Sequence, residues 1–248
     1  MNKLPLLSIV TPSYNQGRYI EKTILSVKDQ NYANFEHIIV DGGSKDNTLK
    51  VLKKYSHLKW VSGKDNGQSA ALNKGFRLAK GSIIGWINSD DTYTPKIFEY
   101  VVDFLEEYKD ADLIYSDCNF IDENDNLIGA WKTHKFNYFF NLNYAQMIPQ
   151  PTIFFRRSIL DKIGYLDESL NYLLDYDFLI RVSKKYHIRR VVDKTFANFR
   201  LQSSSKTMSQ RSRFESELKL IRKRNGAFIP YPLVKLVQFV LGFIKKRY

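Results

Sequence analysis

The sequence has one cysteine, no internal repeat and no apolar run long enough to cross a bilayer. The single cysteine, Cys118, excludes an internal disulfide framework and a cysteine-based metal site. The four histidines lack the spacing of a metal site, so we interpret all four as structural or exposed. The N-terminus runs directly into a strand-like segment, without the apolar region and cleavage site of a signal peptide. We therefore expect a cytoplasmic protein.

Positive charge is in excess, but most of it lies at one end of the chain. The 248 residues include 38 Lys and Arg against 26 Asp and Glu, which gives a formal net charge of +12. From Lys206 onward there are eleven Lys or Arg and two acidic residues, so a net +9 falls there. A nucleic-acid-binding protein usually spreads its charge over one face of the main domain. The distribution argues against specific nucleic-acid binding, which stays the alternative from a different functional class.

The first half of the sequence alternates short apolar runs with segments of helical spacing, which is typical of a mostly parallel sheet with crossover helices. Strands are predicted at residues 6–11, 35–40, 58–61 and 82–87, and helices at 18–30, 46–55, 68–79 and 94–108. In the last helix, Thr94 is predicted as the cap and Pro95 as the first helical residue. The second half adds predicted strands at residues 112–115, 118–121, 127–131, 152–156, 188–192 and 196–201, and a helix at 172–185. The pattern predicts an α/β fold.

Acidic residues follow several of the predicted strands. Asp41 follows the second strand, Asp65 the third, and Asp90 and Asp91 the fourth. Open α/β sheets bind ligands at the carboxyl ends of their strands, and converging carboxylates indicate a cation or a donor-rich ligand. Carboxylate oxygens suit Mg²⁺ or Mn²⁺. For Asp41 or Asp65 alone, a helix cap or a turn explains the residue equally well.

Four motifs, in this order, resemble those of the family 2 glycosyltransferases with the GT-A fold. They are Thr11-Pro12-Ser13-Tyr14-Asn15, the segment from Asp41 to Thr48, the segment from Asp65 through Gln68 and Asn73 to Gly81, and Asn88-Ser89-Asp90-Asp91. The resemblance covers residues 1–205. It implies a nucleotide-binding sandwich with a mostly parallel, mixed central sheet flanked by helices, divided into a donor half (1–110) and an acceptor half (111–205).

The resemblance also implies roles for individual residues. The expected contacts to the nucleotide-sugar donor are Thr11, Pro12, Tyr14, Asn15, Asp41, Asp65, Gln68, Asn73, Asn88 and Asp90. Asp41 is expected to bind the base, and Asp90 and Asp91 to bind Mn²⁺ or Mg²⁺ together with the diphosphate. Uridine is favoured because an aspartate can accept a hydrogen bond from the imide N–H of uracil, although guanine and thymine also present suitable donors.

Two positions depart from the family pattern. Asn88 stands where relatives carry the first acid of the Asp-X-Asp motif, and Gln202 stands where many carry histidine. An asparagine carbonyl can still accept a hydrogen bond from a ribose hydroxyl, but metal ligation then falls to Asp90, Asp91 or both. These departures leave open a catalytically lapsed protein that only binds a nucleotide-sugar.

Direct inversion at the anomeric carbon requires a base for the acceptor hydroxyl, and the resemblance implies Asp175, at the start of a predicted helix. Asp177 faces another direction on that helix, so we expect it to pack or cap. The alternative is that both are solvated carboxylates at a helix N-terminus. The candidates for contacts with the diphosphate or the acceptor are Gln150, Arg200, Gln202 and Lys206. For Arg200 and Lys206, ordinary surface charge is the alternative.

Residues 206–248 are predicted to form a basic, partly amphipathic helical tail. Its last part, residues 228–248, has an apolar run shorter than the about 20 residues that span a bilayer, followed by a basic end. Such a helix suits the cytoplasmic surface of an anionic membrane, which would fit a lipid-linked acceptor. The alternatives are packing on the same domain or on a second subunit of a homodimer. The aromatic stretch 131–144 is expected to be core, with stacking on an acceptor sugar or lipid as its alternative.

The sequence therefore predicts a metal-dependent, inverting glycosyltransferase. Its predicted substrates are a nucleotide diphosphate-sugar and a hydroxyl of a carbohydrate or lipid-linked acceptor, in the synthesis of cell-surface polysaccharide or glycolipid.

Overall fold

The computed structural model describes residues 4–144, 148–202, 211–230 and 232–234. Its strands are β1 (Leu7–Ser13), β2 (Phe35–Asp41), β3 (Leu58–Ser62), β4 (Ile83–Trp86), β5 (Thr92–Tyr93), β6 (Leu113–Ile121), β7 (Leu127–Trp131), β8 (Phe154–Arg156) and β9 (Ile188–Arg200). Its helices are α1 (Ile20–Lys28), α2 (Thr48–Leu52), α3 (Gln68–Leu78), α4 (Ile97–Glu107), α5 (Tyr138–Tyr144), α6 (Ser158–Ile163), α7 (Leu174–Ser183) and α9 (Arg211–Arg224), with a short 3₁₀ turn at Gln150–Thr152.

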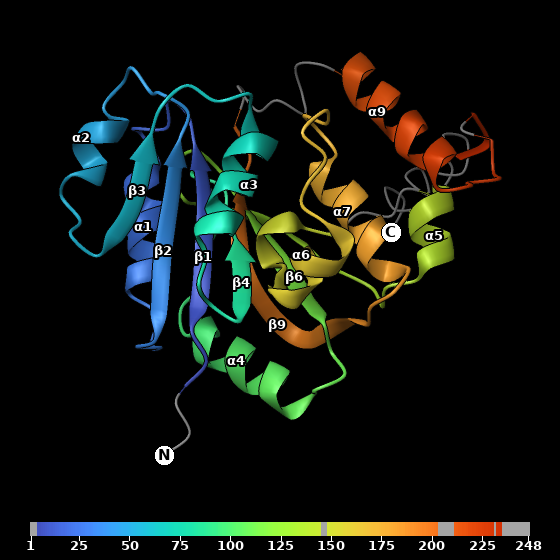
Figure 1. Ribbon diagram of the computed structural model, residues 1–248, viewed down its shortest axis with the longest axis horizontal. Coiled ribbons are helices and arrows are strands. Elements are labelled where there is room, and N and C mark those ends of the chain that lie inside the picture. Colours follow the sequence, from blue (N-terminus) through green and yellow to red (C-terminus); the bar gives the residue numbers. More distant parts are fainter. Residues whose placement is uncertain (1–3, 145–147, 203–210, 231, 235–248) are drawn as a thin grey trace.

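The strands form one mixed sheet with helices on both faces (Figure 1). The order is β3-β2-β1-β4-β8-β6-β9-β5, and β7 pairs with β6 beside this path. The strands β1 to β4 are parallel neighbours, whereas β8 runs antiparallel to both β4 and β6. The carboxyl ends of β1 to β4 therefore share one edge, at the top of Figure 1. The predicted α/β class with a mostly parallel central sheet is confirmed.

Successive side chains of β1 point to opposite faces of the sheet and pack into the hydrophobic core on each face. Ile9 lies in a core with residues of α1 and α4, whereas Val10 lies in a core with residues of α3 and α7. Helix α3 approaches the sheet very closely, since a Cβ at Gly75 would lie 2.3 Å from the Val10 side chain. Any larger residue at this position would push α3 away from the sheet, and α3 begins at the edge where the parallel strands end.

Helix α9 belongs to the packed body of the protein. Leu218 and Ile221 are buried in the same core as residues of α3 and α7. The boundary predicted at residue 205 therefore does not separate α9 from the sheet. Lys206 and residues 235–248 lie outside the described residues. Among the described residues, no helix is long and apolar enough to cross a membrane.

Several element boundaries differ from the prediction for reasons that involve distant residues. β1 continues through Pro12, opposite Val40 on β2, instead of ending there. Helix α4 begins later than predicted, because Lys96 occupies the cap position with φ of 61° and the Ile97 amide donates to Gln30 Oε1 at 2.9 Å. The predicted cap at Thr94 and helical start at Pro95 are therefore wrong. Residues 113–121 and 188–200 each form one strand, whereas the sequence predicted two strands in each region, and the pairing of β6 with β9 shifts register where the predicted breaks lie.

The aromatic stretch 131–144 is only partly core. Phe136 and Tyr138 pack against the core that contains α7 residues. Phe139 and Phe140, in contrast, are 41% and 50% exposed. The expectation that this stretch is core is therefore wrong for these two side chains, because α5 places them on its outer face.

Candidate functional site

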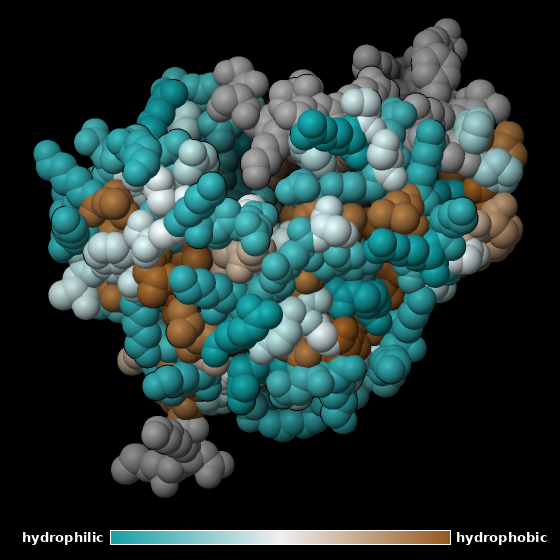
Figure 2. All heavy atoms as spheres, turned by 45° about the horizontal axis from the view of Figure 1, so that its top comes forward, coloured by the Kyte–Doolittle hydropathy of each residue, from teal (hydrophilic) through white to brown (hydrophobic). Residues whose placement is uncertain are grey.

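A cleft of about 550 Å³ lies at the carboxyl edge of the parallel strands. It is lined by Pro12, Ser13, Tyr14, Gln16, Gly42, Lys64, Asp65, Gly67, Gln68, Ala71, Asn88, Ser89, Asp90, Asp91, Phe199, Arg200 and Gln202. Figure 2 turns this edge forward, and the surface beside the grey atoms is mostly hydrophilic. Most of the lining side chains are polar or charged, so the cleft offers hydrogen-bonding groups to a ligand, and it unites most of the residues predicted to bind the donor.

The segment after β4 presents two neighbouring carboxylates in different environments. Asp91 is 1% exposed, and its Oδ1 accepts a hydrogen bond from the Arg200 amide at 2.9 Å. Burial, together with the charge of Asp90, raises the pKa of Asp91 well above its usual range. Asp90 is less buried, and its Oδ2 accepts from Gln202 Nε2 at 2.6 Å. Asp90 is thus better placed to reach a ligand in the cleft, while Asp91 holds the loop.

These two carboxylates fit a divalent cation. Their mutual repulsion, which contributes to the raised pKa of Asp91, would be offset by a positive ion beside Asp90. Within the described residues, no group of three or more His, Cys, Asp or Glu could hold a metal by itself. Mg²⁺ and related hard cations usually bind through one or two carboxylates and complete their coordination with water and phosphate oxygens. The site therefore fits a cation that is bound jointly with a diphosphate.

A chain of side-chain amides supports the same loop. Gln68 Nε2 donates to Asn88 Oδ1 at 2.8 Å, and Asn88 Nδ2 donates to Gln150 Oε1 at 3.1 Å. Gln150 in turn donates to the Trp86 carbonyl at the end of β4, at 2.6 Å. Three predicted site residues therefore lie together, although the carbonyl of Asn88, expected to accept from ribose, already accepts from Gln68. Gln150 does not line the cleft.

Asp41 is turned into the protein. It is 1% exposed, and its carboxylate accepts hydrogen bonds from the amides of Gly43 and Ser44 and from the hydroxyls of Ser44 and Ser62. It does not line the cleft. The geometry therefore supports the turn-forming alternative for Asp41 and gives no support to a direct contact with the base.

Asp65, unlike Asp41, lines the cleft. Its Oδ1 accepts from the Gly67 amide at 2.9 Å, and a Cβ at Gly42 would lie 2.9 Å from its Oδ2. A side chain at position 42 would therefore displace this carboxylate from its place in the cleft wall. Tyr14, which is 61% exposed, lines the same cleft and offers a ring face.

Three other residues predicted to bind the donor do not line the cleft. Thr11 is buried, with its hydroxyl 3.0 Å from the ring of His37. Asn15 accepts a backbone hydrogen bond from the neighbouring turn. Asn73 is buried and exchanges two hydrogen bonds with the backbone of Leu166, at 2.9 and 3.0 Å. Packing and loop support account for these three side chains, and the predicted donor contacts gain no support.

Arg200 is buried and links two loops, so its interpretation as an ordinary surface charge is wrong. It is 1% exposed, and its Nε donates to the Asp90 carbonyl at 2.8 Å. Its Nη1 donates to the Asp122 carbonyl at 2.8 Å and its Nη2 to Asp125 Oδ1 at 2.6 Å. All three guanidinium nitrogens therefore bind protein oxygens and tie the Asp90 loop to the β6–β7 turn. A direct contact between Arg200 and a diphosphate is correspondingly disfavoured.

Three cleft residues, Gln16, Lys64 and Phe199, were not identified from the sequence. Lys64 precedes Asp65 directly, so a cation next to a candidate carboxylate was a signal that could have been used. Phe199 also lines the cleft, but nothing in the sequence distinguishes it from a core aromatic residue of a strand.

Asp175 lies in the first turn of α7 and does not line the cleft. Ser69, one residue after the cleft residue Gln68, donates to the Leu170 carbonyl at 2.8 Å, which holds the segment before α7 against α3. Burial raises the pKa of Asp175 to about 6, against the opposing effect of the helix N-terminal amides. Asp177 is buried and forms an ion pair with Arg181 at 2.7 Å, as expected for a packing carboxylate.

Residues 8–164 match the family model described as Glycosyl transferase family 2. An uncharacterised glycosyltransferase of Rickettsia typhi is 29% identical over 263 residues, covering 98% of this chain and 81% of the relative. Chondroitin synthase of Escherichia coli is 28% identical over 188 residues, covering 74% of this chain but only 27% of that longer protein.

Solved structures show the same fold. S. aureus TarS 1–349 in complex with UDP-GlcNAc superposes with a TM-score of 0.66 at 20% identity, covering 82% of this chain and 60% of that one. The mannosyltransferase PcManGT from Pyrobaculum calidifontis, in complex with GDP-Man and Mn²⁺, gives a TM-score of 0.67 at 15% identity, covering 96% of this chain and 69% of that one. The GT-A fold implied by the sequence motifs is thereby confirmed.

Proposed function

Because this chain belongs to glycosyl transferase family 2, we propose that it transfers a sugar from a UDP-sugar to an acceptor hydroxyl with inversion at the anomeric carbon. The observation that carries the proposal is the joint presence of Tyr14, Asp65 and Asp90 in one polar cleft at the carboxyl edge of the sheet. A nucleotide diphosphate-sugar requires these groups: an aromatic face and a carboxylate for its nucleobase, and a second carboxylate for a cation bound to its diphosphate.

We propose that Asp65 binds the nucleobase of the donor. Its carboxylate can accept the imide N–H of uracil, while the ring of Tyr14 can stack on the base. The structure of TarS with UDP-GlcNAc supports a uridine nucleotide in this fold. PcManGT is bound to GDP-Man, and guanine also carries an imide N–H, so the choice of base requires a direct test.

Asp90, oriented by Gln202, is the proposed ligand of Mn²⁺ or Mg²⁺. When bound, the cation would offset the negative charge that builds up on the leaving diphosphate. Lys64, in the cleft wall, can contribute further positive charge. Lys206, the other predicted cation, lies outside the described residues.

Asp175 is the proposed base. The acceptor oxygen attacks the anomeric carbon from the face opposite the diphosphate, its proton passes to the Asp175 carboxylate, and the bond to the diphosphate oxygen breaks. With a pKa of about 6, the carboxylate is ionised at neutral pH and still basic enough to take a proton in the transition state. The side chain of Gln150 lies next to the Asn88 loop and is a candidate for contact with the transferred sugar.

A thermal-shift comparison of nucleotide diphosphates tests the donor class. UDP with Mn²⁺ at about 100 times its Kd should stabilise the protein by about 2.7 kcal/mol, which raises Tm by roughly 5–10 °C. GDP and dTDP should give smaller shifts, and EDTA should reduce the shift with UDP. A larger shift with GDP would reject uridine, and no shift with any nucleotide would reject the nucleotide-sugar site itself.

The acceptor is proposed to be a carbohydrate or lipid-linked sugar of a cell-surface polymer or glycolipid, reached at the cytoplasmic face of the membrane. Chondroitin synthase among the relatives supports a polysaccharide acceptor. The exposed rings of Phe139 and Phe140 lie 5.5 Å apart, and Phe139 lies 5.4 Å from the ring of Phe228. Exposed aromatic residues near a basic segment suit a membrane interface. A homodimer contact is the alternative for this surface.

Vesicle binding tests that surface. Co-sedimentation with vesicles of phosphatidylglycerol and phosphatidylcholine should fall at least about tenfold in Phe139→Ser/Phe140→Ser, because two exposed aromatic anchors are lost. The shift in Tm with UDP should persist. Equal vesicle binding by the variant and the wild type would exclude these residues, and a change from dimer to monomer in the variant would favour the homodimer.

A further inference from the structure

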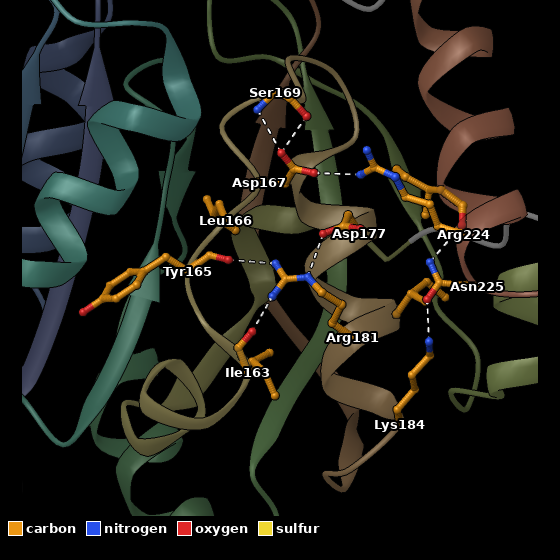
Figure 3. Close-up of polar contacts among 12 residues, drawn as sticks. Ile163, Tyr165, Leu166, Asp167, Ser169, Asp177, Arg181, Lys184, Arg224 and Asn225 are labelled. Atoms are coloured by element: carbon orange, nitrogen blue, oxygen red, sulfur yellow. Dashed lines mark hydrogen bonds and ion pairs between the residues drawn. The ribbon is translucent and has the colours of Figure 1, made fainter.

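The segment that leads into α7 is held from two sides. On one side, α3 binds it through Ser69, which donates to the Leu170 carbonyl, and through Asn73, which exchanges hydrogen bonds with Leu166. On the other side lies α9, where Arg224 Nη1 contacts Asp167 Oδ2 at 2.9 Å, as Figure 3 shows. The segment 166–173 therefore bridges the donor-side helix α3 and the C-terminal helix α9.

Glu217 of α9 makes the most concentrated contact with this segment. Its Oε1 accepts from the amide of Asn171 at 2.8 Å, and its Oε2 accepts from the amides of Tyr172 and Leu173 at 2.9 and 3.0 Å. Three successive backbone amides therefore donate hydrogen bonds to one carboxylate, and hydrogen bonds to a charged acceptor are stronger than those between neutral groups. Leu173 is the residue before α7, and Asp175 follows in the first helical turn.

Helix α9 is well fixed where it presents this carboxylate. Leu218, next to Glu217, is buried in the core that contains α7 residues. Asn225 directly follows α9, and its Oδ1 accepts a hydrogen bond from Nζ of Lys184, the residue after α7, at 2.6 Å (Figure 3). Arg181 on α7 donates to the carbonyls of Ile163 and Tyr165 and braces the start of the same loop. The carboxylate of Glu217 therefore acts from a rigid position.

We infer that Glu217 is a positioning residue for the transfer reaction, because it fixes the backbone from which Asp175 reaches the acceptor hydroxyl. The inference rests on the proposed role of Asp175 as the base. A displacement of about 1 Å at a reacting group can cost roughly 10²-fold in rate, so three hydrogen bonds this close to the base matter for catalysis. The negative charge of Glu217 also adds, after burial, to the raised pKa of Asp175. The C-terminal helix thereby becomes part of the acceptor half of the enzyme.

The test compares Glu217→Gln and Glu217→Ala in the full chain, with Glu215→Gln as the matched control. Glu215→Gln removes the same charge from the same helix but leaves the three amides with their acceptor. With UDP-GlcNAc as donor and water or 4-nitrophenyl glycosides as acceptors, kcat should fall roughly tenfold in Glu217→Gln and roughly 10²-fold in Glu217→Ala. The KM for UDP-GlcNAc and the shift in Tm with UDP and Mn²⁺ should stay unchanged. Hydrogen exchange at amides 171–173 should become faster in both variants but not in Glu215→Gln.

Two results would overturn the inference. One is faster exchange at amides 171–173 with an unchanged kcat, which would make Glu217 purely structural. The other is a parallel loss of kcat and of the shift in Tm with UDP, which would indicate general unfolding; if only Glu217→Ala unfolds, Glu217→Gln decides. Full activity of Asp175→Asn would instead reject the proposed base, while the exchange experiment would still report whether Glu217 orders the segment.

Discussion

Asp90→Asn is expected to lower kcat/KM for sugar transfer by roughly 10²–10³-fold and to remove the response of the enzyme to Mn²⁺. Asp90 is the less buried of two adjacent carboxylates, and Gln202 orients it through a contact of 2.6 Å. Asparagine keeps the size of the side chain but removes the charge that holds a cation against the diphosphate. The measurement is UDP release from UDP-GlcNAc as a function of Mn²⁺ concentration, with EDTA as the zero point.

The free energy of unfolding distinguishes this loss of activity from a loss of structure. Asp90→Asn relieves repulsion with the buried Asp91, so its free energy of unfolding should stay within about 0.5 kcal/mol of the wild type. Arg200→Ala should lose activity together with about 3 kcal/mol of unfolding free energy, because it leaves the carbonyls of Asp90 and Asp122 without their donor and removes one of the two cations that contact Asp125. An Asp90→Asn enzyme with an ordinary Mn²⁺ response would show that the metal binds elsewhere.

The position of the cleft at the carboxyl edge of the sheet was predictable because it follows from local rules. Hydrophobic runs locate β1 to β4, parallel pairing brings their ends to one edge, and polar residues directly after a strand must lie there. Asp65 and Asp90 therefore line the cleft as expected. What the sequence could not distinguish is which acid turns inward. Asp41 looks the same as Asp65 in the sequence, but it is satisfied by two nearby amides and by the hydroxyls of Ser44 and Ser62.

The errors share one physical cause, which is a partner far away in the chain. Gln30, from the segment after α1, accepts a hydrogen bond from the first amide of α4, so the helix begins at Ile97 and not at the predicted cap, Thr94. Arg200 is withdrawn from the surface by oxygens of the β6–β7 turn. Glu217 reads as an ordinary acid in a basic segment until α9 is seen to pack beside residues 171–173. Such contacts depend on tertiary structure, which periodicity and motif spacing do not encode.

Asp175→Asn is expected to lower kcat by roughly 10²–10⁴-fold at pH 8, with little change in the KM for the donor, because the acceptor hydroxyl loses its base. The wild-type rate should rise with pH as Asp175 ionises. With a pKa of about 6, the rate at pH 5 should be roughly a tenth of the plateau. The variant should lack this limb. Pre-steady-state and steady-state UDP release between pH 5 and 8 would measure both effects.

The stability of Asp175→Asn provides an independent check, because the substitution should lower activity without lowering the free energy of unfolding. The pKa of Asp175 is higher in the folded protein than its ordinary value, so the folded state binds more protons than the unfolded state between pH 4 and 6. The carboxyl of Asp175 is therefore best tolerated at low pH, and its contribution to stability declines as pH rises toward 6. Asparagine is neutral throughout, so the variant should be no less stable than the wild type at pH 8. A variant that loses activity and also unfolds more easily at pH 8 would point to a structural role. Lost activity with equal or higher stability would instead identify a group that serves the reaction.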